Sequence, residues 1–563
     1  MPTLQFKGKV FVQNHHLSVP FHELVPVKSK GLSGTPSLHD NVVVHGDNLA
    51  ALKALLPTFH GKVKCVCIDP PYNTGNEKWV FNDSVNSPMM REWLGKTVDR
   101  EDLTRHDKWC CMMFPRLKLF KELLSRDGII AVTIDDNEIS HLGVLMDEVF
   151  GEENRLASAP WLAEPSGGKE KTGLRGGHEY VLIYHNGDPS SVTQEERSTG
   201  ELNLKDKWGP YRKGRELRKW GGISRRGDRP GQWFCLTALD GSEVWPIRND
   251  GEEGHWRWGP QNARMKEILA QPERAHWEKR PYDEGKRYKG ATERWVPYEK
   301  IRDKKRAIGW STWLDEHGFN SDATRELKEI FGEKVFETPK PTALIKWIIS
   351  LHEDPDGIVL DSFAGSGTTG HAVLALNRED DGNRRFILVE CEDYADSITA
   401  ERVRRVIKGV PSAKDEALKD GLGGSFSYFK LGQPMRQESL LDGSNLPDYE
   451  SLAAYVFFTA TGEEWNPKRL KRKAWFIGES RLYDVFLIYE SDVESLKNLA
   501  LTLDMVRGLP TMSGKEKLVF APTKYLDQEF LAKYRITFQQ LPFQIYKVVD
   551  ASTPKARRGT ARK

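Results

Sequence analysis

Two adjacent prolines, Pro70 and Pro71, follow closely on an apolar run at residues 63–68, and this junction limits what the chain can fold into. Proline lacks a backbone N–H and has a fixed φ, so neither a central strand nor a helix continues through Asp69-Pro70-Pro71-Tyr72. A short apolar run bounded by turn residues is typical of a buried strand. The junction therefore predicts a strand that carries Asp69 and Tyr72 just past its carboxyl end.

Strands and helices alternate on both sides of this junction. We expect further strands at residues 41–44, 128–134, 178–185, 357–360 and 385–389, and helices from about residue 49 and at residues 114–124, 139–150 and 342–351. Such alternation predicts an α/β fold with a Rossmann-like sheet. Between residues 188 and 335 the pattern gives way to glycines, charges and nine tryptophans from Trp208 to Trp310. An insertion is therefore predicted between two halves of one sheet.

The length of 563 residues requires several domains. We expect an N-terminal extension at 1–40, a first catalytic half at 41–187, the insertion at 188–335, a second half at 336–423 that binds a cofactor, and a smaller α/β unit at 424–563 with a basic tail. Within that last unit, strands are expected at 483–489, 517–520 and 543–548, and helices at 493–506 and 528–534.

Several classes of protein are disfavoured by composition. The six cysteines form no C-x-x-C pair, which favours reduced thiols over a zinc site. No run approaches the roughly 20 apolar residues that span a bilayer, and the first ten residues lack the apolar core of a signal peptide. We expect a cytoplasmic protein with no membrane contact and no metal.

The loop after the strand at 357–360 reads Asp361-Ser362-Phe363-Ala364-Gly365-Ser366-Gly367-Thr368. A strand, a glycine turn and a helix bring backbone N–H groups close to a cofactor in α/β folds. Glu390 ends the next strand, where a carboxylate can accept the ribose hydroxyl protons of an adenosine-containing ligand. NAD remains an alternative, but the loop lacks G-x-G-x-x-G and the lysine of a P-loop. A cofactor without phosphate, such as S-adenosylmethionine, fits this absence.

The segment Asp69-Pro70-Pro71-Tyr72 suits methyl transfer to an exocyclic amine. Such an amine is a poor nucleophile because its lone pair is delocalised into the ring, and acceptors on its hydrogens pull the nitrogen towards tetrahedral geometry. The Asp69 carboxylate and the Pro70 carbonyl are natural acceptors, and the prolines fix their directions. Tyr72 offers a ring for stacking a flipped base. The competing interpretation is a rigid turn with Tyr72 packed on the sheet.

These motifs resemble the β class of DNA amino-methyltransferases, and in particular the modification subunits of type III restriction systems. The similar segments are HGDNLAALKALLP, VCIDPPYNTGN, HEYVLIYHNG, GGISRRGDRP, KPTALIKWI and ITAERVRRVI. The resemblance covers about residues 41–408 and implies a circularly permuted sheet, with DPPY ahead of the glycine loop. Gly227 stands where an acidic residue is expected, and residues 1–40 match no known segment.

The resemblance also implies a set of site residues. Asp69, Pro70, Pro71 and Tyr72 hold the target base. The methionine moiety of the cofactor is surrounded by Asp361, Phe363, Ala364, Gly365, Gly367 and Thr368. Glu390 holds its ribose, Asp47 lies by its adenine, and Lys340 with Pro341 completes the pocket. Asp47 could instead cap a helix, and Lys340 could be a solvated charge.

The insertion is the expected reader of DNA. Residues 201–310 hold 26 Lys and Arg against 17 Asp and Glu. Its basic side chains are interleaved with Tyr211, Trp220 and Trp233, a mixture typical of nucleic-acid contacts. An insertion between the two halves would overhang the active edge of the sheet. The expected DNA-binding residues are Arg212, Lys213, Arg215, Arg218, Arg225, Arg226 and Arg229.

The function predicted from these features is methylation of adenine N6 in DNA by S-adenosylmethionine, within a restriction–modification system. N4-cytosine methylation is an alternative, because the same acceptors suit any exocyclic amine, and a non-catalytic DNA-recognition subunit is another. The expected partners are double-stranded DNA with a flipped base, a second copy of the chain in a homodimer, and a helicase-nuclease restriction subunit. The C-terminal unit is expected to offer an interface or to act as a stabilising appendage.

Overall fold

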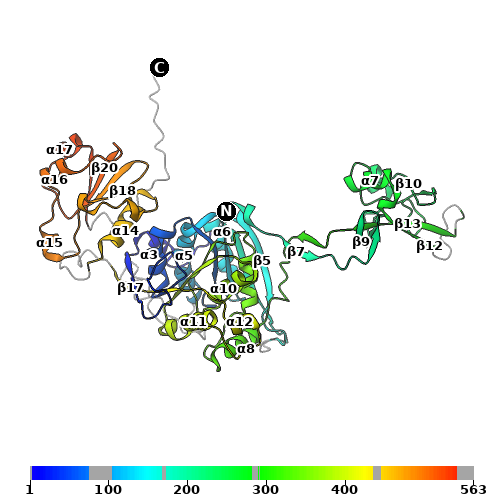
Figure 1. Ribbon diagram of the computed structural model, residues 1–563, viewed down its shortest axis with the longest axis horizontal. Helices are drawn as coiled ribbons and strands as arrows, with labels where there is room; N and C mark the ends of the chain where they lie inside the picture. Colours follow the sequence, from blue (N-terminus) through cyan, green and yellow to red (C-terminus); the bar gives the residue numbers. More distant parts are fainter. Residues whose placement is uncertain are drawn as a thin grey trace, which may run out of the picture. The chain divides into compact units, whose positions relative to one another are not determined.

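The computed structural model describes residues 3–74, 104–167, 173–281, 290, 292–434 and 446–541. The chain forms two compact units. One consists of Met1–Thr193 with Ser311–Lys563, and the other is Gln194–Trp310. The second unit carries the green elements β9, β13 and α7 in Figure 1. Residues 311–335, which the sequence grouped with the insertion, thus belong to the first unit.

A nine-stranded sheet forms the centre of the first unit, in the order β1-β17-β2-β16-β15-β3-β4-β6-β5. The six strands from β17 to β4 run parallel, whereas β1, β6 and β5 are antiparallel to their neighbours. The strands are β1 His22–Pro26, β2 Val42–His45, β3 Val63–Ile68, β4 Leu124–Ile134, β5 Arg155–Leu162, β6 His178–His185, β15 Ile358–Asp361, β16 Arg385–Glu390 and β17 Ser427–Pro434.

The strand order confirms the predicted permuted α/β fold. β15 and β16, from the second half of the sequence, lie between β2 and β3 from the first half. Val42, Val43 and Val44 of β2 are fully buried, as expected for a strand covered on both faces. The two halves therefore complete one sheet and share one core.

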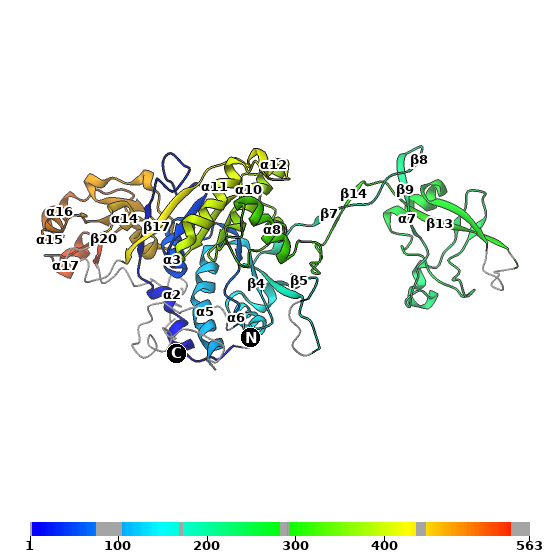
Figure 2. The same cartoon turned by 90° about the horizontal axis from the view of Figure 1, so that it is seen from below.

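Helices cover both faces of this sheet (Figures 1 and 2). One group contains α3 Asn48–Phe59, α5 Arg105–Leu123 and α6 Ile139–Phe150, and the other contains α8 Asn320–Phe331, α9 Thr342–Ser350, α10 Thr368–Asp380 and α11 Glu401–Lys408. In α6 the apolar residues Leu142, Leu145, Met146 and Val149 recur at helical spacing and are buried. Among the described residues, no helix has the length and apolar character needed to cross a membrane.

Two elements at the sheet edges were not predicted. β5 lies outside β6 and forms one edge of the sheet. β1, from the N-terminal extension, pairs with β17 at the opposite edge. The short helices α1 Lys9–Val12 and α2 His15–Ser18 contact α5. The extension at 1–40 is thus built into the first unit.

Residues 446–541 form a smaller layer of helix and sheet. Helix α14 Tyr449–Thr461 packs on strands in the order β18-β19-β20-β21. These are β18 Phe476–Glu479, β19 Tyr483–Leu487, β20 Glu516–Ala521 and β21 Ile536–Gln540, and α17 is Gln528–Lys533. Phe21 stacks on Tyr455 with ring centroids 4.3 Å apart, which joins this layer to the N-terminal extension.

The single helix predicted at 493–506 is wrong. Two short helices, α15 Val493–Lys497 and α16 Leu503–Gly508, occupy this stretch. Between them the N–H of Leu501 donates to the carbonyl of Thr523 at 2.9 Å, a tertiary bond that a continuous helix would break. The strand predicted at 543–548 lies outside the described residues.

The second unit is mainly β structure. Its four-stranded sheet has the order β12-β13-β9-β8, from His276–Pro281, Glu293–Ile301, Gly209–Glu216 and Leu204–Asp206. Helix α7 Ala263–Ala270 and the pair β10 Leu236–Thr237 and β11 Glu243–Val244 pack near a core that includes Trp256 and Trp277. The entering strand β7 Glu195–Ser198 pairs with the leaving strand β14 Lys305–Ile308. The tryptophan-rich stretch therefore has a core of its own.

Candidate active site

The DPPY segment and the glycine loop follow neighbouring strands. β3 ends immediately before Asp69, and β15 ends at Asp361, the first residue of the loop. These strands are parallel, with Leu360 beside Val66. The carboxyl ends of parallel neighbours meet at one edge, where open α/β sheets bind their ligands. The two motifs therefore emerge side by side although nearly three hundred residues separate them in the sequence.

The glycine loop has a backbone that requires glycine. Gly365 and Gly367 have φ values of +50° and +79°, in the left-handed region. A Cβ on Gly367 would lie 2.7 Å from the carbonyl oxygen of Thr399. The hydroxyl of Thr399 in turn donates to the Gly365 carbonyl at 2.6 Å. The loop is thus pressed against residue 399, with no room for a side chain at position 367.

Asp361 holds the loop in shape. Its carboxylate accepts a hydrogen bond from the N–H of Phe363 at 3.0 Å and another from the hydroxyl of Thr369 at 2.6 Å. Burial raises the pKa of Asp361 to about 7. Next to it, Phe363 packs against the main core, and the N–H of Ala364 donates to the carbonyl of Val389 at 3.1 Å. Asp361 thus joins the end of its strand to the turn that follows.

A buried cluster lies beneath the loop at Thr368. Arg402 of α11, which is fully buried, donates to the Thr368 hydroxyl at 2.7 Å. The same guanidinium contacts His371 at 3.2 Å and Glu326 of α8 at 3.4 Å. Burial lowers the pKa of His371 to about 4, so this imidazole is neutral. The cluster fixes the start of α10, and sequence reasoning missed both Arg402 and Glu326.

Glu390 lies beside the loop at the end of β16. Its two carboxylate oxygens accept from the N–H groups of Gly365 at 2.7 Å and Glu392 at 3.0 Å. Burial raises its pKa, and these backbone donors partly offset the effect. A carboxylate offers about four acceptor positions, so two remain for a ligand hydroxyl. Glu390 thus orders the loop and keeps the capacity to bind.

Asp47 caps a helix near this point. It is the N-cap of α3, and its carboxylate accepts from the N–H of Ala50 at 2.9 Å. The preceding residue, Gly46, donates its N–H to the carbonyl of Glu390 at 2.9 Å. The cap role that the sequence left open is therefore present, and nearly half of the Asp47 side chain is still exposed beside Glu390.

Asp69 is held by two side chains. One of its oxygens accepts from the Thr133 hydroxyl at 2.5 Å, and the other lies 2.9 Å from the ammonium nitrogen of Lys340. About a third of the Asp69 side chain is exposed. Its carboxylate is thus fixed in direction while remaining open to a ligand.

Lys340, which the resemblance assigned to the cofactor pocket, lies against the DPPY segment. Its ammonium group contacts Asp69 and lies 3.6 Å from Glu179 and 4.8 Å from the centre of the Tyr72 ring. Burial lowers the pKa of Lys340, but the two carboxylates outweigh this and raise it above its ordinary value. Lys340 is therefore charged, and its contacts are with the DPPY segment. Pro341 follows it as the N-cap residue of α9.

Tyr72 is anchored through its hydroxyl, which donates to Glu179 at 2.8 Å. Burial raises the pKa of Tyr72 well above its ordinary value, so the hydroxyl stays protonated and can donate. The ring packs partly on the main core. Sequence reasoning missed Glu179, although a carboxylate inside the predicted strand at 178–185 was a signal that it has a polar partner.

The two prolines differ in their backbone contacts. The carbonyl of Pro71 accepts from the indole N–H of Trp109 at 2.6 Å. Within the described part of the chain, the carbonyl of Pro70 has no hydrogen-bond donor. The Pro70 carbonyl, which the sequence analysis predicted as an acceptor, is therefore available to an incoming amine. The Pro71 carbonyl instead fixes the segment to Trp109.

The seven predicted DNA-binding residues of the second unit differ in burial and in their partners. Arg218 is buried, at 4% exposure, and its guanidinium binds Glu216, Asn249 and the carbonyl of Ile247. Its predicted contact with DNA is therefore wrong in this structure, because the side chain holds the unit's own loops together.

The other arginines and lysines differ in their charge partners. Lys213 pairs with Glu278 at 2.5 Å, and Arg226 pairs with Glu253 at 2.8 Å. Arg212 is half-buried on β9. Of the predicted DNA-binding residues, three exposed arginines form no ion pair with any residue that the structure describes, and they are Arg215, Arg225 and Arg229.

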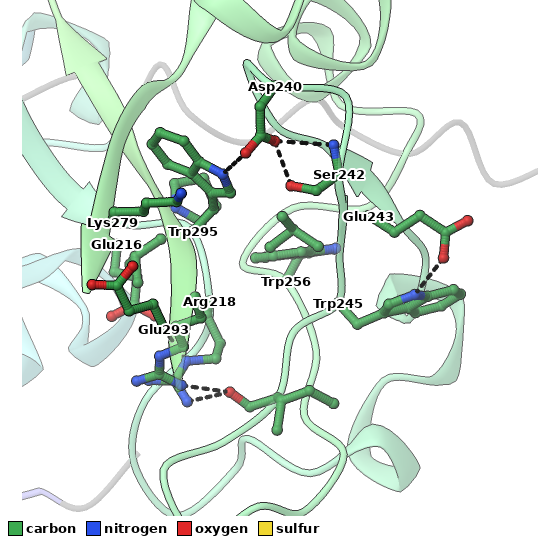
Figure 3. A pocket seen from close by; sticks show the side chains of 15 residues that line it. Glu216, Arg218, Asp240, Ser242, Glu243, Trp245, Trp256, Lys279, Glu293 and Trp295 are labelled. Atoms are coloured by element: carbon green, nitrogen blue, oxygen red, sulfur yellow. Dashed lines mark hydrogen bonds and ion pairs between the residues drawn. The ribbon is translucent and has the colours of Figure 1, made fainter. Parts of the chain in front are cut away.

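A cavity of about 410 Å³ lies inside the second unit (Figure 3). Tryptophans 245, 256 and 295 line it. Asp240 accepts from the indole N–H of Trp295 at 2.7 Å and from the N–H of Ser242 at 3.0 Å. Because its lining comes from the second unit alone, this cavity is separate from the site at the end of β3 and β15.

Comparison with known proteins places these motifs in context. A family model described as a DNA methylase matches residues 63–401. The type II methyltransferase M.KpnI of Klebsiella pneumoniae is 33% identical over 375 residues, which are 64% of this chain and 82% of that protein. The Mod subunit of the type III restriction-modification enzyme EcoPI, from Escherichia phage P1, is 30% identical over 428 residues. That match covers 68% of this chain and 64% of the length of the phage protein.

Among solved structures, the complex of M1.HpyAVI with SAM aligns with 64% of this chain and 98% of its own, at 15% identity and a TM-score of 0.29.

Proposed function

The chain belongs to the DNA methylase family, and from this premise we propose that it transfers the methyl group of S-adenosylmethionine to the N6 amine of adenine in DNA. The observation that carries the proposal is the position of Asp69, fixed by Thr133 and Lys340 at the sheet edge that also carries the glycine loop. One edge thus supplies both an acceptor for an amine and a backbone cradle for a cofactor.

The residues at this edge fit S-adenosylmethionine. The left-handed glycines 365 and 367 leave the loop without side chains there, and the buried carboxylate of Glu390 keeps two acceptor positions for ribose hydroxyls. Asp47, half-exposed beside Glu390, is in reach of the same ligand. When bound, the cofactor supplies an electrophilic methyl group on a sulfonium.

Asp69 and Pro70 act on the nucleophile. Hydrogen bonds from the amine to the Asp69 carboxylate and the Pro70 carbonyl localise the nitrogen lone pair and aim it at the methyl donor. Lys340 and Thr133 hold the carboxylate in advance, so no reorganisation is needed at the moment of transfer. The proton that the amine loses passes to Asp69 or to water.

The target base is proposed to leave the DNA stack and to lie on Tyr72. A base inside a duplex cannot reach this edge of the sheet. Because Glu179 and the Lys340 ammonium fix the ring of Tyr72, the stacking surface is ordered before the base arrives.

The second unit is proposed to read the DNA. Exposed arginines without ion pairs are suited to phosphate or base contacts, and Arg215, Arg225 and Arg229 meet this description. Lys213 and Arg226 can join them only by exchanging a carboxylate partner for DNA.

Assembly is proposed to follow the type III pattern, with a homodimer and a helicase-nuclease restriction subunit. The support is the phage relative, which is by name the Mod subunit of such an enzyme. Residues 446–541 carry no part of the catalytic edge and leave a layer of helix and sheet for these contacts. Light scattering of the intact chain tests the dimer, and a monomer with full site-specific methylation would contradict it.

Cytosine N4 is the second candidate target, because the acceptor geometry at Asp69 suits either amine. The deciding experiment is sequencing of DNA from cells that express the protein, with detection of both modified bases. N6-methyladenine at one sequence motif is expected. N4-methylcytosine would change the target, and unmodified DNA together with intact DNA binding would favour a recognition subunit.

A further inference from the structure

Two helix starts bring three potential metal ligands together next to the DPPY segment. His106 lies in the first turn of α5, Glu138 is the N-cap residue of α6, and His141 follows it in the first turn. One ligand atom from each side chain lies within 4.8 Å of the others. α5 and α6 pack against each other, so the cluster rests on two fixed elements.

The carboxylate of Glu138 is the centre of the cluster. It is fully buried, and its two oxygens lie 2.6 Å from Nδ1 of His106 and 2.7 Å from Nδ1 of His141. Both imidazoles keep about a third of their surface exposed. The buried carboxylate thus faces two partly exposed imidazoles, so solvent reaches the cluster from the imidazole side.

We propose that His106, Glu138 and His141 form a binding site for a divalent transition-metal ion, for which Zn²⁺ is the natural probe. Two imidazoles and one carboxylate are a recurrent protein ligand set for zinc, with water in the remaining position. Imidazole nitrogen also favours this class of ion over Mg²⁺ or Ca²⁺, which prefer oxygen ligands.

The side chains must adjust their spacing to admit an ion. Ligands bound at about 2.0–2.1 Å with tetrahedral angles lie about 3.3 Å apart. The imidazoles must therefore withdraw from the Glu138 oxygens by about 0.6–0.7 Å, and ligand atoms that now lie up to 4.8 Å apart must approach to this spacing. Their Nδ1 protons must move to Nε2 or to solvent. Their exposed outer faces permit this rotation. The ion then balances the charge of a carboxylate that is otherwise buried.

Occupancy of this site would act on the catalytic segment through Asn73. Its side-chain amide donates to the same Glu138 carboxylate, and its backbone has a left-handed φ of 59° directly after Tyr72. On the proposed function, which this part of the inference presupposes, the ion serves to position Asp69 to Tyr72 and does not touch the substrate. The sequence analysis expected no metal because the cysteines form no C-x-x-C pair, and it did not connect His106 with Glu138, which lies 32 residues further along the chain.

The test is a Zn²⁺ titration of the full chain after chelation and dialysis. One equivalent is expected to bind tightly, and the double variant His106→Ala with His141→Ala is expected to bind at least about a hundredfold more weakly. His39→Ala is the matched control, because His39 is exposed and, within the described part of the chain, forms hydrogen bonds only through its backbone. The control should bind like the unchanged protein.

Two further measurements make the outcome decisive. Co²⁺ in place of Zn²⁺ should give visible d–d absorption that the double variant lacks. Zn²⁺ should raise the melting temperature of the unchanged protein and of the control, but not that of the double variant. Equal Zn²⁺ affinity in the double variant would overturn the site and leave a hydrogen-bonded triad. Because these readouts need no methylation, Zn²⁺ binding without methyl transfer would refute the proposed function and leave the site standing.

Discussion

Replacement of Gly367 by alanine tests whether the loop geometry controls cofactor binding. The left-handed φ of +79° costs an alanine about 1–2 kcal/mol. The new Cβ would also lie 2.7 Å from the Thr399 carbonyl oxygen, so loop or carbonyl must move by roughly half an ångström. Such overpacking adds about 1–3 kcal/mol. We expect the free energy of unfolding to fall by about 2–5 kcal/mol in total.

The same displacement should weaken the binding of S-adenosylmethionine. A binding site tolerates errors of about 0.5 Å, so we expect at least a tenfold rise in Kd, or about 1.4 kcal/mol. Calorimetry measures the affinity and urea denaturation the stability. Gly332→Ala is the control, since Gly332 has a φ of +86° and open space around its Cβ. This control should lose only the about 1–2 kcal/mol that a left-handed φ costs an alanine, and it should bind the cofactor with unchanged affinity. An unchanged Kd in Gly367→Ala would refute the argument.

Four further outcomes are expected. Asp69→Ala should fold and bind S-adenosylmethionine but methylate at least about a hundredfold more slowly in a labelled-methyl assay, and near-normal turnover would contradict the acceptor role. Lys340→Met should lower the free energy of unfolding, measured by urea denaturation, by about 1–3 kcal/mol, because Asp69 is about two-thirds buried and loses its cation. An unchanged denaturation midpoint would count against a stabilising role of this ion pair. Arg225→Glu combined with Arg229→Glu should weaken DNA binding, reduce the slope of log affinity against log salt concentration by about 2, and leave the affinity for the cofactor unchanged. An unchanged slope would exclude both arginines from contact with phosphates. Burial lowers the pKa of His371 to about 4 in the folded state from an ordinary 6.5, so between these pH values the unfolded chain binds a proton that the folded chain excludes. The free energy of unfolding should therefore fall as the pH drops from 6.5 towards 4. His371→Gln should flatten this pH dependence, and parallel curves for the two proteins would contradict the argument.

The elements that the sequence predicted well are those whose signals are local. The apolar run at 63–68 became β3 with the predicted bounds, and the run at 178–185 became β6. Helix α9 starts at Thr342 as expected. By contrast, the helix expected at 493–506 is divided, because the hydrogen bond from Leu501 to Thr523 depends on a distant segment. Local periodicity carries no information about such a partner.

Charge at a sequence position likewise did not reveal its partner. Arg218 looked like its basic neighbours, yet the fold of the second unit buries it against Glu216 and Asn249. Lys340 was assigned to the cofactor pocket through the resemblance, and only the adjacency of α9 and β3 shows that its ammonium contacts Asp69. A long cationic side chain can reach partners several ångströms away, so its contacts depend on which helices and strands become neighbours in the fold.

The sequence by itself determined the chemistry that each segment brings. Prolines and glycines act through their own φ angles, so the DPPY segment and the glycine loop, including Gly367, were recognisable without a structure. Tertiary structure decided which groups meet. The order β15-β3-β4-β6 brings Asp361, Asp69, Thr133 and Glu179 to one edge, and the packing of α5 on α6 joins His106 to Glu138. These contacts depend on strand order and burial, which are properties of the whole chain and of no single segment.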